Sequence, residues 1–416
     1  MPNGLLINYL KLLQKFGKWQ VVKSILEIPL KPGKFTGEHR IWSASTLNEV
    51  EVCPKRFALR RASFPEIWPR AGFPNRISAA QIKGIVVHEV VSMIMNSVQS
   101  SSDLPEISVM SFLKERGGYI ELLKIILEKE LQSASSNPRA ELMVESIKRE
   151  VLADISELRG QVQYFVKESV GKVAGVVARV DNLNINETEP TTFQIPYINS
   201  EYKIVDSEFP IEGYLDLLLT NEDIDHIIDY KTSKTIHEEY WDQLRLYAWL
   251  WNRSAKNLRK RDCRIEVITG ANTSESRVVK IEDLPTIQIK VLDRIQTAEQ
   301  SITGEVTAKP SIDSCKFCAV KVMCDPYWKM IENQSTVAKW LDMRVRTTGS
   351  LGGNAWRVSI LSDDTPAMLI IGDRDDGSIE IGQEFRLLNV YKNEDEETGV
   401  VIRLSQNSEV FRTVTN

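Results

Sequence analysis

Hydrophobic positions follow a helical spacing through the first part of the chain. Residues 1–40 carry leucines and aromatic residues three or four positions apart with lysines between them, which predicts an N-terminal helical arm. From residue 77 to about residue 170 the spacing is again helical. Breaks are expected at Ser100–Asp103 and Ser133–Pro138, where serine, asparagine, aspartate and proline gather. The sequence therefore predicts a first half built mainly from helices.

The pattern changes near Thr191, where short runs typical of strands begin. They read F-Q-I-P-Y-I, Y-K-I-V, G-Y-L-D-L-L-L and H-I-I-D-Y. A helix is predicted over Glu238–Trp251, a further strand over Arg264–Thr269 and another helix over residues 280–300. Helices that precede, interrupt and follow a group of strands indicate an α/β fold, with a mixed sheet flanked by helices.

Beyond residue 337 the pattern becomes all-β. Five short alternating runs, separated by Gly, Asp and Asn, predict a small barrel or sandwich. We therefore expect three parts: the helical arm over 1–40, a central α/β domain over 41–330 and a C-terminal β-barrel over 338–416. We also expect the central domain to stay folded when the barrel is removed.

The composition favours a globular protein of a reducing compartment. Of 416 residues, 42% are hydrophobic and 26% are charged, and no apolar run approaches the ~20 residues of a membrane helix. The N-terminus lacks the features of a signal peptide, so a cytoplasmic protein without membrane contact is expected. The odd number of cysteines, five, favours reduced thiols and metal ligation over disulfides. Because the net charge is −5, contacts with nucleic-acid phosphates would require local basic patches.

Two carboxylates and a lysine interrupt the strand-like runs. Asp229 and Lys231 lie two positions apart and so share one face of the sheet. If Thr220–Asp225 forms the turn that precedes them, Asp216 lies directly opposite Asp229. Like charges at opposite positions destabilise a sheet, whereas a Mg²⁺ or Mn²⁺ ion between them reverses the sign of that interaction. Lys231 would then activate water or counter phosphate charge; the alternative is a surface hairpin with solvated carboxylates.

Three further polar side chains lie on apolar helical faces. His88, in G-I-V-V-H-E-V-V, is either a core histidine or a metal ligand. Gln243 and Tyr247 are four residues apart and share one face of a helix. They are either a buried pair in the core or part of a functional site.

Four of the five cysteines form a split motif. Cys53 lies near the start of the central domain, and C-K-F-C-A-V-K-V-M-C places Cys315, Cys318 and Cys324 near its end. One early and three late ligands suit Zn²⁺ or an iron–sulfur cluster, although the spacing matches neither paired zinc ligands nor the ferredoxin runs. In either case the site would join the two ends of the domain. Cys263 has no neighbouring cysteine and is predicted to be a core residue.

These motifs together resemble the RecB-like branch of the PD-(D/E)XK nucleases. The motifs that carry the resemblance are Asp216, Asp229-Tyr-Lys231, Gly84-x-x-x-His88, Gln243-x-x-x-Tyr247 and the segment S-A-S-T-L-N-E-V-E-V-C-P-K-R-F. The cysteine arrangement is similar to that of the iron–sulfur subset, which includes CRISPR-associated RecB-like exonucleases and AddB-type nuclease domains. The resemblance covers about residues 42–328.

The resemblance implies a metal-dependent deoxyribonuclease, expected to be an exonuclease, that acts on single-stranded DNA or DNA ends. It implies a catalytic Mg²⁺ or Mn²⁺ whose ligands are His88, Asp216, Asp229 and the carbonyl of Tyr230. Lys231 would be catalytic.

For the other motifs, the resemblance implies that Gln243 and Tyr247 steady the active site or the DNA. It also implies a [4Fe-4S] cluster on the four cysteines of the split motif. A catalytically silent DNA-end-binding subunit and a zinc-stabilised adaptor are the alternatives with the same fold.

The expected partners are DNA and a helicase or a CRISPR or other defence protein, in DNA repair or phage defence. No P-loop of the form G-x-x-x-x-G-K-[ST] occurs, so the chain is not itself a motor.

The C-terminal part loosely resembles an OB-fold, a barrel that often binds single strands. Aromatic and basic side chains there are candidate contacts to a single strand. They are Trp356, Arg357, Phe385, Arg386 and Tyr391.

Overall fold

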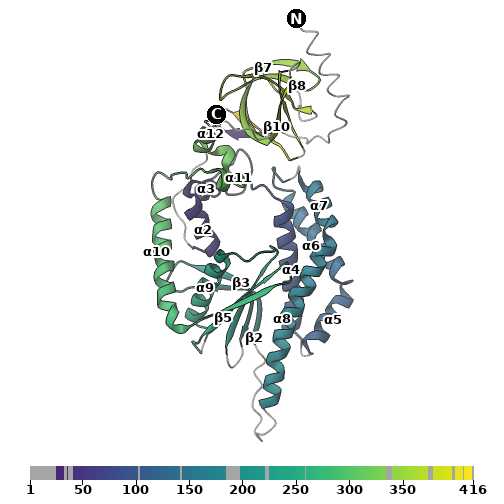
Figure 1. Cartoon of the computed structure of the whole chain (residues 1–416), viewed down its shortest axis with the longest axis vertical. Coiled ribbons are helices and arrows are strands. Elements are labelled where there is room, and N and C mark those ends of the chain that lie inside the picture. Colours follow the sequence, from purple (N-terminus) through teal and green to yellow (C-terminus); the bar gives the residue numbers. More distant parts are fainter. Residues whose placement is uncertain are drawn as a thin grey trace.

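The computed structural model describes most of the 416 residues. The described residues are 25–31, 35, 41–101, 104–140, 143–183, 197–220, 224–257, 259–333, 340–372, 378–395, 399–405 and 407–414. Within these ranges, no helix has both the length and the apolar character needed to cross a membrane. Figure 1 shows a β-barrel at one end of the molecule and a sheet between two groups of helices at the other.

The central part is organised around a mixed sheet in the order β2-β3-β4-β5-β6 (Figure 1). The strands are β2 (Tyr197–Val205), β3 (Glu212–Thr220), β4 (Asp225–Lys231), β5 (Cys263–Thr269) and β6 (Ser274–Val279). Only β4 and β5 are parallel to each other. Parallel neighbours need a crossover connection, and here α9 (Glu238–Arg253) supplies it. Six of the seven residues of β4 are buried, as expected for a strand covered on both faces.

A block of long helices covers one face of this sheet (Figure 1). The block consists of α4 (Ala79–Gln99), α5 (Pro105–Glu115), α6 (Tyr119–Ala134), α7 (Val144–Ala153) and α8 (Ile155–Leu183). Leu217 and Leu219 of β3 and Ile228 and Tyr230 of β4 pack into the core beneath these helices. The predicted breaks after α4 and near the end of α6 are confirmed.

The opposite face of the sheet packs on α9, α2 (Ala44–Val52) and α10 (Leu284–Ile302), which follows a short 3₁₀ turn over Ile281–Asp283. Leu218 of β3 and Ile227 of β4 belong to this second core, together with Trp42, Trp241 and Trp249. The alternation of residues between two cores reflects the two-residue period of a strand. The sequence prediction of a mixed sheet flanked by helices is confirmed.

The cysteine motif lies between the sheet and the barrel (Figure 1). The helices around it are short: α3 (Pro54–Leu59), α11 (Ile312–Lys316), a 3₁₀ turn over Lys321–Met323 and α12 (Asp325–Glu332). The two ends of the central domain meet here, because the backbone N–H of Lys55 donates to the carbonyl of Thr307 at 3.1 Å.

The C-terminal strands close into a five-stranded barrel with a two-stranded extension. The barrel strands are β7 (Trp340–Gly352), β8 (Ala355–Ile360), β9 (Pro366–Ile370), β10 (Glu384–Asp395) and β11 (Gly399–Arg403). They pair in the ring β7-β8-β9-β11-β10, which closes through β10 and β7. β12 (Glu409–Val414) pairs with β10, and β1 (Leu26–Pro29) pairs with β12. The prediction of a small barrel is confirmed.

The segment Leu26–Pro29 departs from the sequence prediction. Most of residues 1–40 lie outside the described ranges, but these four residues form a strand parallel to β12, so a helix is wrong for them. The strand that pairs with this segment lies far away in the sequence, so no local pattern predicts the pairing.

The barrel shares a hydrophobic cluster with the cysteine motif. Ile28 of β1, Leu388 of β10 and Phe411 of β12 pack in the same cluster as the three late cysteines and Trp328. Leu388 and Phe411 are at most 2% exposed. We therefore no longer expect the central domain to stay folded when the barrel is removed, since removal would expose this cluster to water.

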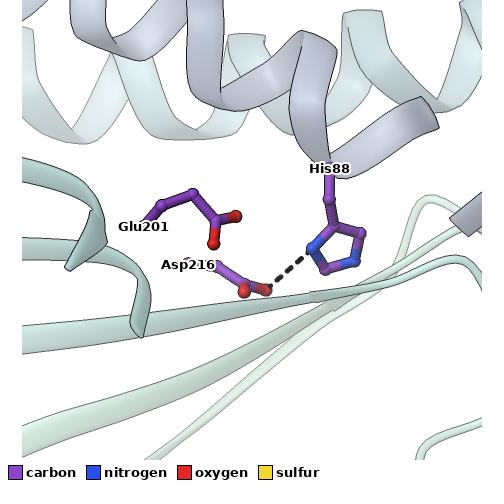
Figure 2. A group of neighbouring side chains, drawn as sticks. All are labelled: His88, Glu201 and Asp216. Carbon is purple, nitrogen blue, oxygen red and sulfur yellow. Dashed lines mark ion pairs between the residues drawn. The ribbon is translucent and has the colours of Figure 1, made fainter. Parts of the chain in front are cut away.

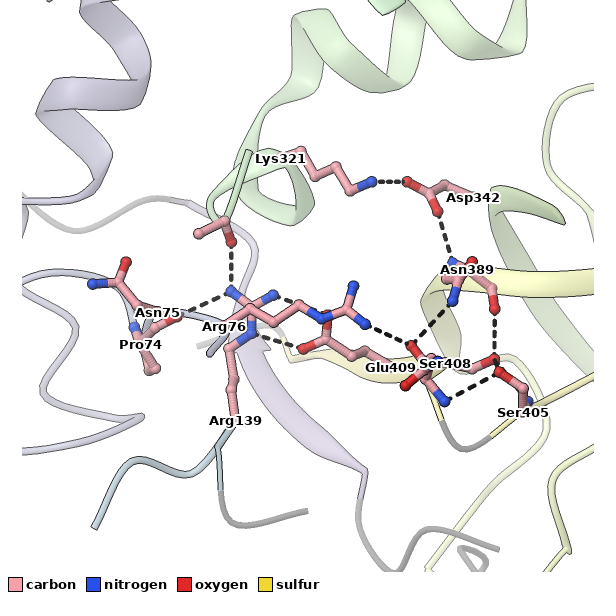
Figure 3. A network of polar contacts seen from close by, with 12 residues as sticks. Pro74, Asn75, Arg76, Arg139, Lys321, Asp342, Asn389, Ser405, Ser408 and Glu409 are labelled. Atoms are coloured by element: carbon pink, nitrogen blue, oxygen red, sulfur yellow. Dashed lines mark hydrogen bonds and ion pairs between the residues drawn. The ribbon is translucent and has the colours of Figure 1, made fainter. Parts of the chain in front are cut away.

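A buried arginine reinforces this junction (Figure 3). Arg139, which follows α6, is 4% exposed. It donates Nε and Nη2 hydrogen bonds of 2.9 and 3.0 Å to the carboxylate of Glu409 on β12. Its Nη1 donates to the carbonyls of Pro74, at 3.0 Å, and Ala319. One side chain thus connects the helical block, the cysteine motif and the barrel extension.

Candidate active site

The two aspartates meet where β3 and β4 begin to separate. Thr220 pairs with Asp225 and Leu217 pairs with Ile228, which confirms the predicted register. The next position brings Asp216 to the level of Asp229, but the strand pairing has ended there. Instead, the backbone N–H of Tyr230 donates to Oδ2 of Asp216 at 2.7 Å. The two carboxylates therefore lie in a buried gap between neighbouring strands.

Lys231 connects this gap to α9. Its Nζ lies 2.7 Å from Oδ2 of Asp229 and donates to Oε1 of Gln243 at 3.4 Å. The amide of Gln243 then donates from Nε2 to the hydroxyl of Tyr247 at 2.8 Å. The structure therefore brings together the predicted lysine and the predicted pair on α9, and Gln243 orients the ammonium group.

The side chain of Tyr230 points away from the gap into the core beneath α4 and α8. It is 1% exposed, stacks on Phe165 at 5.1 Å and shares a 2.7 Å hydrogen bond with Ser169. Only the backbone of Tyr230 can therefore contribute to the site.

His88 enters the site from α4. Ser78 caps the first turn of this helix by accepting the N–H of Gln81 at 3.2 Å. Ten residues on, Nδ1 of His88 lies 3.4 Å from Oδ2 of Asp216. Figure 2 shows the imidazole pointing from the helix toward the sheet. The structure thus places His88 beside the carboxylates, which favours the ligand over the core histidine.

Glu201 of β2 is a further carboxylate at the site, and the sequence analysis missed it. One ligand atom each of His88, Glu201 and Asp216 lie within 4.8 Å of one another (Figure 2). Pairing of Ser200 with Leu217 and of Tyr202 with Leu215 places Glu201 at the level of Asp216. Extending the register of β3 to the preceding strand would have found this residue.

The charges of the site are only partly balanced. Burial raises the pKa of Asp229 to about 6; the ammonium group of Lys231 opposes this shift, and the charge of Asp216 adds to it. Partial burial of the Glu201 carboxylate, whose residue is otherwise exposed, raises its pKa to about 7, and the charge of Asp216 adds to this shift. Three carboxylates therefore compete for two cationic side chains, His88 and Lys231.

The two cationic side chains are stabilised in their charged forms, whereas Asp229 and Glu201 are stabilised in their neutral forms. Burial alone would lower the pKa of His88, but the charge and hydrogen bond of Asp216 raise it to about 9. Burial would likewise lower the pKa of Lys231, and Asp229 and Asp216 raise it instead. For Asp216, burial would raise the pKa, but His88 lowers it. A buried site with more carboxylates than cationic side chains is stabilised when a divalent cation binds to it.

The four cysteines of the split motif line one cavity. Its walls are formed by Cys53, Cys315, Cys318 and Cys324, together with Arg56, Lys321 and Tyr327. The backbone N–H of Lys309 points to Sγ of Cys53 at 3.5 Å. Cys263 is buried in β5, away from this cavity, as predicted.

Three of the five barrel side chains that were predicted to contact a single strand of DNA are not available for such contacts, so the prediction is wrong for them. Phe385 is fully buried and Trp356 is 8% exposed, because both point into the barrel. Arg386 is 5% exposed and donates to the carbonyl of Val322 in the cysteine motif. Arg357 is exposed and Tyr391 is half-buried. The alternating pattern of β10 does not reveal that its outer face is covered by another part of the chain.

A comparison with models of protein families found a match over the central part of the chain. The family model of the PD-(D/E)XK nuclease superfamily matches residues 41–325. The chain belongs to this superfamily. Its members generally use Mg²⁺ or Mn²⁺, and the carboxylate and histidine cluster of this chain has the ligands that these ions require.

Comparison with solved structures found more distant likenesses. The crystal structure of SSO0001 is 16% identical over 49% of this chain and 95% of that chain, with a TM-score of 0.25. A murine DNA-binding protein bound to double-stranded DNA is 9% identical over 53% of this chain and 99% of that chain, with a TM-score of 0.19. A comparison with curated proteins gave no match.

Proposed function

We propose that the protein is a metal-dependent deoxyribonuclease that hydrolyses phosphodiester bonds of single-stranded DNA or at DNA ends, as an exonuclease. The observation that carries the proposal is the meeting of Asp216, Asp229 and Lys231 in one buried gap, with the Lys231 ammonium 2.7 Å from Asp229. A catalytically silent DNA-binding subunit would have no need to keep these like charges buried together, because each costs stability.

His88, Asp216, Asp229 and the carbonyl of Tyr230 would hold the cation. When bound, Mg²⁺ or Mn²⁺ supplies a Lewis acid and lowers the pKa of its water. Lys231 stays positively charged at neutral pH, since its carboxylate neighbours raise its pKa. It therefore stabilises the negative charge that develops on the phosphoryl oxygens, rather than removing a proton.

Gln243 and Tyr247 act through Lys231. The amide oxygen of Gln243 accepts a hydrogen bond from the ammonium group, and the hydroxyl of Tyr247 fixes the amide. They are positioning residues of the site, which develops the sequence prediction that they steady it.

We further propose that the four cysteines bind a [4Fe-4S] cluster, as in the RecB-like iron–sulfur subset. The single cavity that all four cysteines line supports a common metal centre at this site. Protein purified without oxygen should be brown and contain about four irons per chain, whereas stoichiometric zinc would support the adaptor alternative.

The barrel is proposed to be an OB-fold that guides a single strand. Its strand ring, with one parallel pair between β9 and β11, supports this fold. A groove between the barrel and the cysteine motif is lined by more basic than acidic side chains, among them Lys316, Lys392 and Arg76. Phe317 is 80% exposed at this groove and is available to stack on a base.

The groove can be tested by substitution of Phe317. Phe317→Ala should weaken binding of long single strands by roughly tenfold, since one base loses its stacking partner. Ile289→Ala, at a residue 70% exposed on α10, is the matched control. Equal affinities of the two variants, measured by fluorescence anisotropy, would remove the groove from the proposal.

A partner would supply any strand separation, because the sequence contains no P-loop. A helicase or a CRISPR or other defence protein is proposed for this role, in the cytoplasm, where the thiols stay reduced.

The function itself is tested by digestion of end-labelled single-stranded and duplex DNA with Mn²⁺, Mg²⁺ or EDTA. We expect progressive shortening of the single strand with Mn²⁺ or Mg²⁺ and none with EDTA. Cleavage that persists in EDTA would exclude the proposed mechanism, and complete inactivity with every divalent ion would favour the DNA-binding subunit.

A further inference from the structure

The central sheet has an open surface beside the candidate active site. On β3, a side chain at Gly213 would meet the ring of Tyr247 of α9, and Leu215 packs in the core on the α9 side. Because successive side chains of a strand point to opposite faces, Tyr214 points to the other face, from which His88 of α4 enters the site. Tyr214 is 47% exposed, so this part of the face is open to solvent.

A lysine shares this open face with Tyr214. Lys203 of β2 lies directly opposite Tyr214 in the register of the sheet. Its neighbours Tyr202 and Ile204 pack with the core on the α9 side, so its own side chain points to the open face. The ammonium group lies 5.3 Å from the centroid of the Tyr214 ring and 2.9 Å from the carboxylate of Glu212. An aromatic ring and a cation therefore lie together on an exposed part of the sheet.

This pair lies close to the carboxylates of the site along the strands. Tyr214 is two positions before Asp216 on β3, and Lys203 is two positions after Glu201 on β2. Two residues of a strand span roughly 7 Å. A DNA strand whose cleaved phosphate lies at the site therefore has its next nucleotide within reach of Tyr214 and Lys203.

Both side chains suit an unpaired nucleotide. Exposed aromatic rings stack on bases of any sequence, whereas a base inside a duplex is already stacked on both of its faces. Among the Phe, Tyr and Trp side chains of the described ranges, only Tyr214 and Phe317 are exposed, and Phe317 belongs to the groove at the barrel. The ion pair of Lys203 with Glu212 is solvent-exposed and hence weak, so a DNA phosphate can replace the carboxylate.

We propose that Tyr214 and Lys203 form the subsite for the nucleotide next to the cleaved phosphodiester bond. Tyr214 stacks on the unpaired base of this nucleotide, and Lys203 contacts its phosphate. This inference rests on the proposed function and identifies unpaired DNA as the ligand of the open face. The alternative is a cross-strand pair that only stabilises the contact between β2 and β3.

The test is a binding cycle between Tyr214 and single bases of a short single-stranded oligonucleotide. Affinity is measured by fluorescence anisotropy in EDTA, and one abasic nucleotide is moved along the oligonucleotide from each end. At one position the abasic nucleotide should cost the unsubstituted protein roughly tenfold in affinity, and Tyr214→Ala should cost as much with the intact oligonucleotide. At that position the two losses should not add, because they remove the same contact.

Further variants separate recognition of the base from folding. Tyr214→Phe keeps the ring and should bind as the unsubstituted protein does. Tyr214→Leu keeps an apolar side chain on the strand without the ring, and should behave as Tyr214→Ala does. Val278→Ala is the matched control, because Val278 is 49% exposed on the edge strand β6. It should bind normally and keep the loss at the abasic position.

The contact of Lys203 with phosphate is tested by the dependence of binding on salt. Lys203→Gln should weaken binding and reduce the slope of log affinity against log salt concentration by about 0.7, which corresponds to one phosphate contact with a single strand. An unchanged slope would remove Lys203 from the subsite.

The outcomes separate this inference from the proposed function. The subsite is overturned if the losses add at every abasic position, if Tyr214→Phe does not restore binding, or if no single strand binds in EDTA, even when DNA is cleaved with Mn²⁺. A non-additive position in a protein that cleaves no DNA with any divalent ion would overturn the nuclease and leave the subsite standing.

Discussion

Two clusters of charged side chains, the candidate active site and the junction around Arg139, differ in their balance of charge. At the junction, the guanidinium of Arg139 meets the carboxylate of Glu409 with two parallel hydrogen bonds. Charge and hydrogen-bonding capacity are matched there. In the active site, Asp216, Asp229 and Glu201 outnumber the cationic side chains around them.

The pKa directions of the two clusters express this difference. Burial would raise the pKa of Glu409, but Arg139 lowers it below its ordinary value. Burial raises the pKa of Asp229 to about 6, and Lys231 does not overcome that effect. A matched cluster stabilises the fold, whereas an unmatched one destabilises the metal-free protein and is stabilised by a ligand of opposite charge. The difference supports a structural role for the cluster around Arg139 and the proposed cation-binding role for the other.

The largest expected effect is on cleavage. Asp216→Ala and Asp229→Ala should each lower the cleavage rate by ~10³-fold or more, because each removes a carboxylate on which the cation depends. DNA binding should persist, since negative charge near the phosphates is lost. Asp242→Ala, at an exposed aspartate of α9, is the control and should cleave normally. A loss below tenfold, measured with end-labelled DNA and Mn²⁺, would separate the carboxylates from catalysis.

At the junction, the expected effect is on stability. Arg139→Met leaves Glu409 buried without its partner and should lower the free energy of unfolding by about 3–5 kcal/mol. Lys148→Met breaks the exposed ion pair with Glu128 and should change little. Chemical denaturation monitored by circular dichroism measures both. Equal stabilities of the two variants would show that the junction does not hold the barrel in place.

A smaller effect of opposite sign is expected in the active site. Because the pKa of Asp229 is raised in the folded state, its charge opposes folding, and metal-free protein should lose stability as the pH rises through about 6. Asp229→Asn should therefore stabilise the metal-free protein at pH 7, on the order of 1 kcal/mol, while cleavage is lost. Thermal melting in EDTA checks this, and a destabilised variant would contradict the unmatched character of the site.

The smallest effect is a pH dependence at the junction. The pKa of Glu409 is lowered on folding, so its contribution to stability is full above its ordinary value of 4.5 and is lost as the pH falls below it. Glu409→Gln should be less stable at pH 7 but should lose less stability between pH 5 and pH 3. Parallel slopes for the two proteins would contradict the role of this ion pair.

The sequence predicted those contacts that depend on short separations along the chain. Asp216 and Asp229 lie on two strands that are consecutive in the sequence, so their register could be predicted. Gln243 and Tyr247 followed from helical spacing. The strand period also explains why Tyr230 points away from Lys231.

Contacts between distant segments could not be predicted in this way. Arg139 and Glu409 are 270 positions apart, and no local pattern connects them. Arg386 reads as an exposed basic residue of a strand, but its partner carbonyl lies in the cysteine motif. Glu201 lies inside β2, between two short apolar runs that are separate in the sequence, and its left-handed conformation depends on tertiary structure.

The most direct test of the account is a Mn²⁺ titration of one preparation, in which bound Mn²⁺ and cleavage of end-labelled single-stranded DNA are followed together. If the carboxylates of Asp216 and Asp229 hold the catalytic cation, cleavage should begin as Mn²⁺ binds, and Asp229→Asn should lose both. Cleavage before any Mn²⁺ is bound, or undiminished cleavage by Asp229→Asn, would contradict the account.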